Sequence, residues 1–152
     1  MKARALVVCV GNALVGDDAV GCAVHARLAA GRLPDGVRLE LLGVGGLRLL
    51  DLLDGEETLV AVDAVQLGAP PGTVHALSWD ELPPPLHAVT SHGLGLREAM
   101  EVGRLLHPER MPARAFLVGV EGRSFDRVGE GMTPPVEAAV GAAAERALAL
   151  AS

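Results

Sequence analysis

Apolar residues along this chain occur in short continuous runs and in longer stretches with helical spacing. Short continuous apolar runs are typical of strands that are buried on both faces of a sheet. Apolar positions four residues apart, as at Val20, Val24 and Leu28, predict a helix with one buried face. Strands are expected at 5–10, 37–42, 58–62, 73–79 and 115–120, and helices at 18–30, 45–55, 93–106 and 134–150.

Strands that alternate with helices in this way predict an α/β fold. We expect a three-layer α/β/α sandwich around a twisted, mainly parallel five-stranded sheet. The strand at 73–79 is expected to be antiparallel, because the connection before it is too short for a crossover helix. Without repeats or a break in composition, residues 1–152 are expected to form a single domain. Such sheets place their chemistry in loops beyond the carboxyl ends of the strands.

Composition excludes several classes of protein. Half of the residues are hydrophobic and 21% are charged, which excludes extensive disorder. The net charge of −6 and the 2% of aromatic residues argue against a nucleic-acid partner, since phosphate binding needs a basic face and single strands need stacking platforms. Two cysteines are too few for a disulfide scaffold or a thiolate zinc site. With neither an apolar leader nor a run of about 20 apolar residues, a cytoplasmic protein without membrane contact is expected.

The segment Gly11–Gly21 (GNALVGDDAVG) leaves a predicted strand and enters a predicted helix. It lacks the Gly-Lys-Ser/Thr ending of a phosphate-binding loop, and its glycine spacing does not match the dinucleotide fingerprint. Asp17 and Asp18 would repel a phosphate and attract a cation. Either could instead cap the helix at the positive end of its dipole. Since a pair is more than one cap requires, one of the two is expected to face the cleft.

Two later residues stand where they could join this pair. Asp63 directly follows a predicted buried strand, a position taken by turn formers and by catalytic carboxylates of α/β enzymes. His92 precedes the helix expected at 93–106; a single loop histidine is more often a surface residue. If the strand at 73–79 is antiparallel, the proline-rich stretch 80–89 must bring the chain back to the same edge of the sheet as Asp63.

The residues offer two other possible hydrolase sites. Cys22 and His25, three apart on one helix, could act as a thiol nucleophile and its base. A thiol on a helix rich in small apolar residues is, however, more often buried and inert. Ser91 lies beside His92 but lacks the context of a nucleophile elbow. We set both interpretations aside.

The segment Gly11–Gly21 resembles the opening motif of the nickel-iron hydrogenase maturation proteases. The resemblance continues in order at Gly43–Leu47, Val62–Ala64, Ser91–Leu96, Leu117–Val120 and Gly131–Glu137. In that family the metal is bound by the second acid of the opening motif, the Asp after the third strand and the His before the next long helix. Carried over, these are Asp18, Asp63 and His92.

The resemblance implies a metal-dependent endopeptidase that removes the C-terminal peptide from the nickel-loaded precursor of a nickel-iron hydrogenase large subunit. Nickel would be recognised in the substrate precursor, and another divalent cation could occupy the same site. Asp18, Asp63 and His92 would be the catalytic and metal-binding residues, whereas the general base is not identified. Asp17 would orient water or cap the helix, and the cap is favoured. A small domain that acts on a larger partner is expected to work as a monomer.

The chain departs from the family pattern at two positions. Ala19 stands where relatives often have Gly, and Leu41-Leu42 stands where they often have an Asp before the Gly-rich segment. The second departure leaves substrate recognition open. One alternative is therefore a nickel-sensing accessory protein that binds the hydrogenase precursor without cutting it. A nucleotide- or flavin-binding α/β domain is a third, which the acidic pair disfavours.

Overall fold

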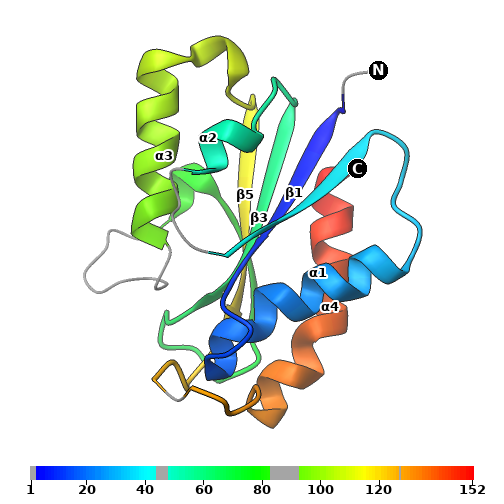
Figure 1. Ribbon diagram of the computed structural model, residues 1–152, viewed down its shortest axis with the longest axis vertical. Coiled ribbons are helices and arrows are strands. Elements are labelled where there is room, and N and C mark those ends of the chain that lie inside the picture. Colours follow the sequence, from blue (N-terminus) through cyan, green and yellow to red (C-terminus); the bar gives the residue numbers. More distant parts are fainter. Residues whose placement is uncertain (1–2, 44–47, 83–92, 127) are drawn as a thin grey trace.

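A computed structural model describes residues 3–43, 48–82, 93–126 and 128–152 (Figure 1). The strands are β1 (Ala5–Val10), β2 (Val37–Leu42), β3 (Thr58–Val65), β4 (Val74–Ser78) and β5 (Arg114–Glu121). The helices are α1 (Val20–Ala30), α2 (Leu49–Leu52), α3 (Gly93–Leu106) and α4 (Pro134–Ala151), with single three-ten turns η1 (Gly16–Ala19), η3 (Trp79–Glu81) and η4 (Pro108–Arg110). No helix in these described ranges is both long and apolar enough to span a bilayer.

The five strands form one sheet in the order β2-β1-β3-β5-β4. All neighbours are parallel except β4, which is antiparallel to β5. The mainly parallel sheet and its antiparallel strand are therefore confirmed. The turn around Gly68–Gly72 is too short for a crossover helix, so β4 runs antiparallel to its neighbour in the sheet. That neighbour is β5, which lies between β3 and β4.

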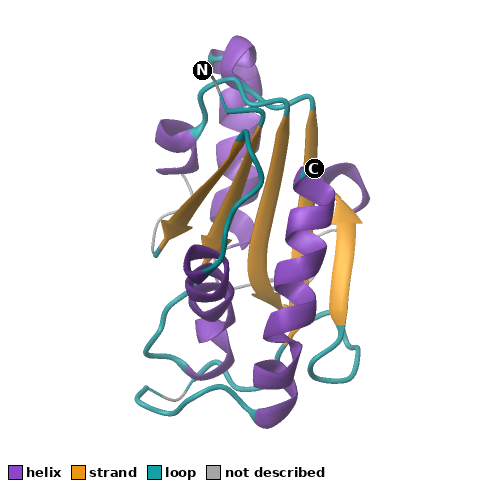
Figure 2. Ribbon diagram, turned by 90° about the vertical axis from the view of Figure 1, so that its right-hand side faces the viewer, coloured by secondary structure: helices purple, strands orange, loops and turns teal. Residues whose placement is uncertain are grey.

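Helices cover both faces of the sheet, which confirms the three-layer sandwich (Figures 1 and 2). On one face α1 and α4 pack against alternate strand residues such as Val7 and Val62. On the other face α2 and α3 pack against the intervening residues, such as Val8 and Ala61. Because β1 and β3 lie in the middle of the sandwich, both of their faces are buried, which is the physical reason for their continuous apolar runs.

Glycine at position 21 allows α1 to begin against the carboxyl end of β1. A Cβ atom at Gly21 would lie 1.9 Å from the carbonyl oxygen of Val10, far inside van der Waals contact. No side chain fits there without moving the helix or the strand. This close approach brings the first turn of α1, including Cys22, to the end of the sheet where β1 stops.

Three expectations differ from the structure in detail. The helix expected at 18–30 is divided into η1 and α1. The strand expected to end before Asp63 continues to Val65, because Asp63 to Val65 pair with Gly119 to Glu121 of β5 and extend the ladder. The short helix expected at 45–55 spans only Leu49–Leu52, while residues 44–47 lie outside the described ranges.

Candidate functional site

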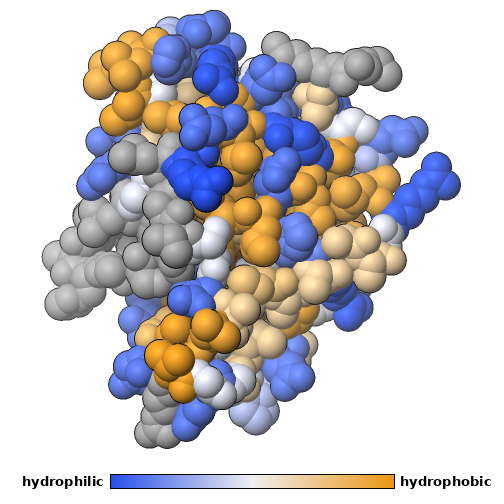
Figure 3. Space-filling view, in the orientation of Figure 1, coloured by the Kyte–Doolittle hydropathy of each residue, from blue (hydrophilic) through white to orange (hydrophobic). Residues whose placement is uncertain are grey.

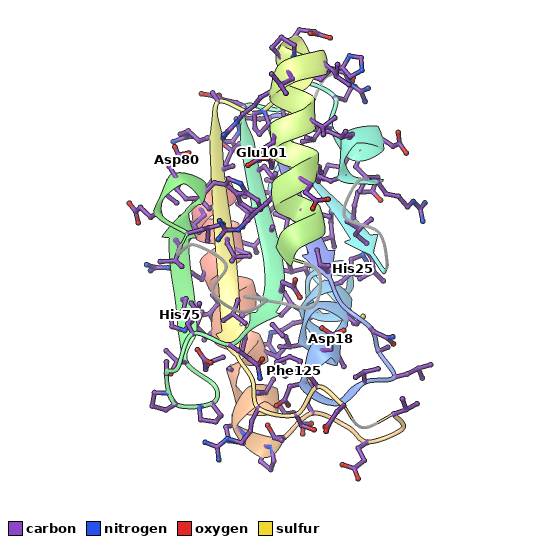
Figure 4. All side chains as sticks on the ribbon, turned by 90° about the vertical axis from the view of Figure 1, so that its left-hand side faces the viewer. Asp18, His25, His75, Asp80, Glu101 and Phe125 are labelled. Atoms are coloured by element: carbon purple, nitrogen blue, oxygen red, sulfur yellow. The ribbon has the colours of Figure 1, made fainter. Side chains whose placement is uncertain are left out.

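The loops that follow β1, β3 and β5 meet at one end of the sheet, which we call the carboxyl edge. It lies at the bottom of Figure 1. The strand β5 follows α3 and starts at the opposite end of the sheet. The carboxyl end of α3 therefore lies at that opposite end, and its amino end is directed towards the carboxyl edge. Figure 4 shows Asp18 and Phe125 at this end of the molecule and Asp80 at the other.

Asp18 and Asp63 are both buried at the carboxyl edge. Asp18 lies on η1 with 4% of its surface exposed, and Asp63 lies within β3 with none. The turn that carries Asp18 is fixed by its backbone, since Asp18 N donates to Val15 O (2.9 Å) and Asn12 N donates to Asp18 O (3.2 Å). Asp63 Oδ1 accepts a hydrogen bond from Ala64 N at 2.8 Å.

The half-buried thiol of Cys22 lies close to both carboxyl groups. Its pKa is raised, first by burial and then by the negative charges of Asp18 and Asp63. Because both charges act on one thiol, the structure brings these two predicted site residues into the same neighbourhood. The raised pKa also keeps the thiol protonated near neutral pH, which supports setting aside Cys22 as a nucleophile.

The third residue of the predicted metal set, His92, lies outside the described residues. It immediately precedes Gly93, where α3 begins. Within the described ranges, no group of three or more His, Cys, Asp or Glu side chains is arranged to hold a metal ion. The three-residue metal site therefore stays a prediction, supported by the convergence of its two carboxylates.

Asp17, the neighbour of Asp18, has a different environment. Its buried carboxylate accepts hydrogen bonds from Arg123 N (2.8 Å), Ser124 N (3.0 Å) and Thr133 N (2.7 Å), and from the Thr133 hydroxyl (2.9 Å). Burial alone would raise the pKa of Asp17, but these hydrogen bonds outweigh it and lower the pKa below 3.8. No side-chain cap is formed at η1. The prediction that Asp17 caps the helix is therefore wrong, because its bonds go to a distant loop.

The loop at 122–133 is thus joined to the loop after β1. Val15 and Val128 form an isolated antiparallel bridge, and Gly129 N donates to Leu14 O at 2.8 Å. Gly16 has a positive φ of 42°, and a Cβ there would lie 2.5 Å from Ser124 O. The two loops form one unit beside Asp18, with the Asp17 carboxylate at its centre.

Comparison with known families identifies the family to which this chain belongs. The family model HycI, described as hydrogenase maturation protease, matches residues 22–150. The chain belongs to the hydrogenase maturation protease family. This confirms the resemblance seen in the sequence.

Several family members are similar over nearly the whole chain. The hydrogenase 2 maturation protease of Escherichia coli is 34% identical over 149 residues, covering 96% of this chain and 89% of the relative. The solved structure of the hydrogenase-maturating endopeptidase HybD from E. coli has a TM-score of 0.84 at 33% identity, covering 96% of this chain and 90% of that one. HybD from Thermococcus kodakarensis has a TM-score of 0.79 at 28% identity, with coverages of 98% and 99%.

Two other relatives are longer than this chain. The hydrogenase expression/formation protein HupD of Rhodobacter capsulatus is 32% identical over 136 residues, which are 88% of this chain but 64% of HupD. The HupD protein of Thiocapsa roseopersicina is covered to 65%. The chain thus spans about two thirds of the length of these two relatives.

A further buried carboxylate, that of Glu121, fixes the other side of the carboxyl edge in this family member. Both of its oxygens accept a hydrogen bond from Leu67 N (3.0 and 2.9 Å), and Oε1 lies 3.1 Å from His75 Nε2. Its backbone pairs with Gly72 and Thr73. Glu121 therefore holds the loop between β3 and β4. The pair of Glu121 and His75 was not predicted from the sequence, in which the one signal is an acid at the end of a predicted strand.

Proposed function

We propose that this protein is a metal-dependent endopeptidase that removes the C-terminal peptide from the nickel-loaded precursor of a nickel-iron hydrogenase large subunit. Family membership supports the reaction. The observation that carries the site assignment is the pair of buried carboxylates, Asp18 and Asp63, whose charges both act on the Cys22 thiol. We further propose that the chain is one domain that acts as a cytoplasmic monomer.

Asp18, Asp63 and His92 are the residues that would hold the ion. Two carboxylate oxygens and one imidazole nitrogen suit a divalent cation and leave positions open for substrate. The burial of both carboxylates fits this role, because buried charges in proteins are commonly compensated by a cation. A divalent ion bound there would polarise a carbonyl group or lower the pKa of a bound water. Nickel itself belongs to the substrate in this proposal.

The surrounding residues prepare the site without touching the reacting bond. Asp17 fixes the turn that carries Asp18 by tying it to the loop after β5. Because Asp18 and Asp63 lie away from water, their electrostatic attraction for a cation is stronger than that of exposed carboxylates. The protonated Cys22 thiol adds no third negative charge. These residues therefore favour a cation at the carboxyl edge over an anion.

The test is to incubate the purified protein with nickel-loaded and with metal-free precursor and to follow the precursor by mass spectrometry. We expect a mass loss equal to a C-terminal peptide from the nickel-loaded form alone. Asp18→Asn, Asp63→Asn and His92→Ala should each abolish this loss. Suitable controls are Asp51→Asn and His107→Ala, which change exposed residues away from the carboxyl edge.

The same experiment separates the proposal from the non-cleaving alternative. A nickel-sensing accessory protein would bind the precursor and leave its mass unchanged. Cleavage by Asp18→Asn or His92→Ala at the wild-type rate would show that these residues do not form the catalytic site.

A further inference from the structure

Exposed apolar side chains are concentrated at the carboxyl edge. The described part of the chain has five exposed large apolar residues. Leu14 (65% exposed) and Val128 (76% exposed) lie in the joined loops beside Asp18, and Leu41 lies at the end of β2 at the same edge. Figure 3 shows apolar side chains gathered over the loops at the lower end of this face. The other two, Leu105 and Leu106, lie at the far end of α3.

Leu14 and Val128 lie on two backbone segments that are paired with each other; we call these two residues the apolar crest. The antiparallel bridge joins Val15 to Val128, and Gly129 N donates to Leu14 O. Beneath them, the Asp17 carboxylate binds backbone amides of the same loop. These hydrogen bonds thus fix the two backbone segments that carry the solvent-exposed crest. A surface ordered before binding loses little entropy when a partner arrives.

The apolar crest is continuous with the candidate active site. Leu14 and Asp18 belong to one short segment, and Asp18 N donates to Val15 O within it. Leu14 therefore lies within the segment that carries Asp18. Solvent-exposed aliphatic side chains on a rigid support are suited to anchor apolar residues of an extended peptide.

We propose that the apolar crest binds aliphatic residues of the protein substrate next to the bond that is cut. This inference rests on the proposed endopeptidase function, and it assigns the crest to substrate recognition, separate from the chemistry of Asp18 and Asp63. The crest and the carboxylate pair would act together: the crest fixes where the substrate chain lies, and the carboxylates hold the ion.

Two other occupants fit the crest less well. A stable dimer buries about 800 Å² on each partner, far more than two aliphatic side chains expose. A membrane surface with anionic lipids would be repelled by the exposed carboxylates of Asp126 and Glu130, which lie in the same loop as Val128. A short apolar segment of a protein substrate matches the small area of the crest.

The test compares the double variant L14S/V128S with the matched control L105S/L106S, which removes equally exposed apolar residues at the far end of α3. Binding of each protein to the purified nickel-loaded precursor is measured by biolayer interferometry, and cleavage is measured in parallel. We expect the crest variant to raise Kd and KM by at least about tenfold, because two aliphatic contacts with the substrate are lost. Its kcat and its affinity for a divalent probe such as Zn²⁺ should equal those of the wild type.

The outcomes distinguish this inference from the proposed function. An unchanged Kd for the crest variant, or an equal loss in the control, overturns the role of the crest even if the wild type cleaves normally. A wild type that leaves the precursor intact refutes the protease proposal and, with it, the position of the crest beside a cut bond, whereas a crest-dependent Kd would still assign the crest to precursor binding. Self-association of the wild type that L14S/V128S abolishes in sedimentation would assign the crest to a second copy of the chain and also overturn the inference.

Discussion

The substitution Asp17→Asn tests whether the buried carboxylate joins the two loops at the carboxyl edge. An amide group has one acceptor oxygen where the carboxylate has two. If that oxygen still accepts the hydrogen bonds from the Arg123 and Ser124 backbone N–H groups, the new –NH2 group faces the Thr133 backbone N–H group. The Thr133 hydroxyl can rotate to accept from it, so one part-buried N–H group, that of the Thr133 backbone, loses its acceptor.

The magnitude follows from these losses. A buried donor without an acceptor costs about 1–3 kcal/mol, and the two remaining bonds weaken because their acceptor is no longer charged. The free energy of unfolding should therefore fall by about 3 kcal/mol. That is a large part of the roughly 5–15 kcal/mol typical of a domain, yet it leaves a folded protein.

Urea unfolding provides the assay, followed by far-UV circular dichroism and by the fluorescence of Trp79, the one tryptophan of the chain. The matched control is Asp126→Asn, which changes an exposed carboxylate in the same loop and should alter stability by no more than about 0.5 kcal/mol. A loss below about 1 kcal/mol for Asp17→Asn would refute the reasoning, since the loops would then be held together by other contacts.

The same carboxylate makes a prediction about pH. Because the folded state lowers the pKa of Asp17, its stabilisation is fully present above the ordinary value of 3.8 and is lost as the pH falls through the folded-state pKa. The stability difference between the wild type and Asp17→Asn should be constant between about pH 7 and 5 and should shrink below about pH 4. A difference that grows on acidification would contradict this sign.

Two further predictions concern the start of α1. Gly21→Ala should cost more than about 3 kcal/mol or prevent folding, because its Cβ would lie 1.9 Å from Val10 O; Gly31→Ala, whose Cβ would have no neighbour closer than 3.9 Å, should be nearly neutral in the same urea assay. In native alkylation with iodoacetamide, Cys22 should react slowly at neutral pH, and Asp18→Asn should accelerate it severalfold by removing a charge that raises the thiol pKa. Cys9, whose pKa burial raises to about 12, should stay unmodified in both proteins, and an unchanged Cys22 rate would show that Asp18 does not act on this thiol.

The fold could be predicted from the sequence because the relevant signals are local. The apolar run of β1 and the spacing of Val20, Val24 and Leu28 follow from burial on two faces or on one, and both patterns are visible within a few residues. The antiparallel direction of β4 followed from the length of one connection. The ordered set of motifs from Gly11–Gly21 to Gly131–Glu137 indicated the family, and the position of Gly11–Gly21 after a predicted strand placed Asp18 at the edge of the sheet.

The roles of two adjacent, identical residues were decided only by the tertiary structure. Asp17 binds Arg123 and Thr133, which lie 106 and 116 residues further along the chain, whereas Asp18 lies with Asp63 beside Cys22. No local pattern distinguishes the two aspartates, because the difference depends on the path of a loop that returns after β5. The pairing of His75 with Glu121 depends in the same way on the register between β4 and β5. The sequence by itself determined which segments are buried and which family they form, and the meeting of distant segments determined that Asp17 joins two loops while Asp18 lies with Asp63 beside Cys22.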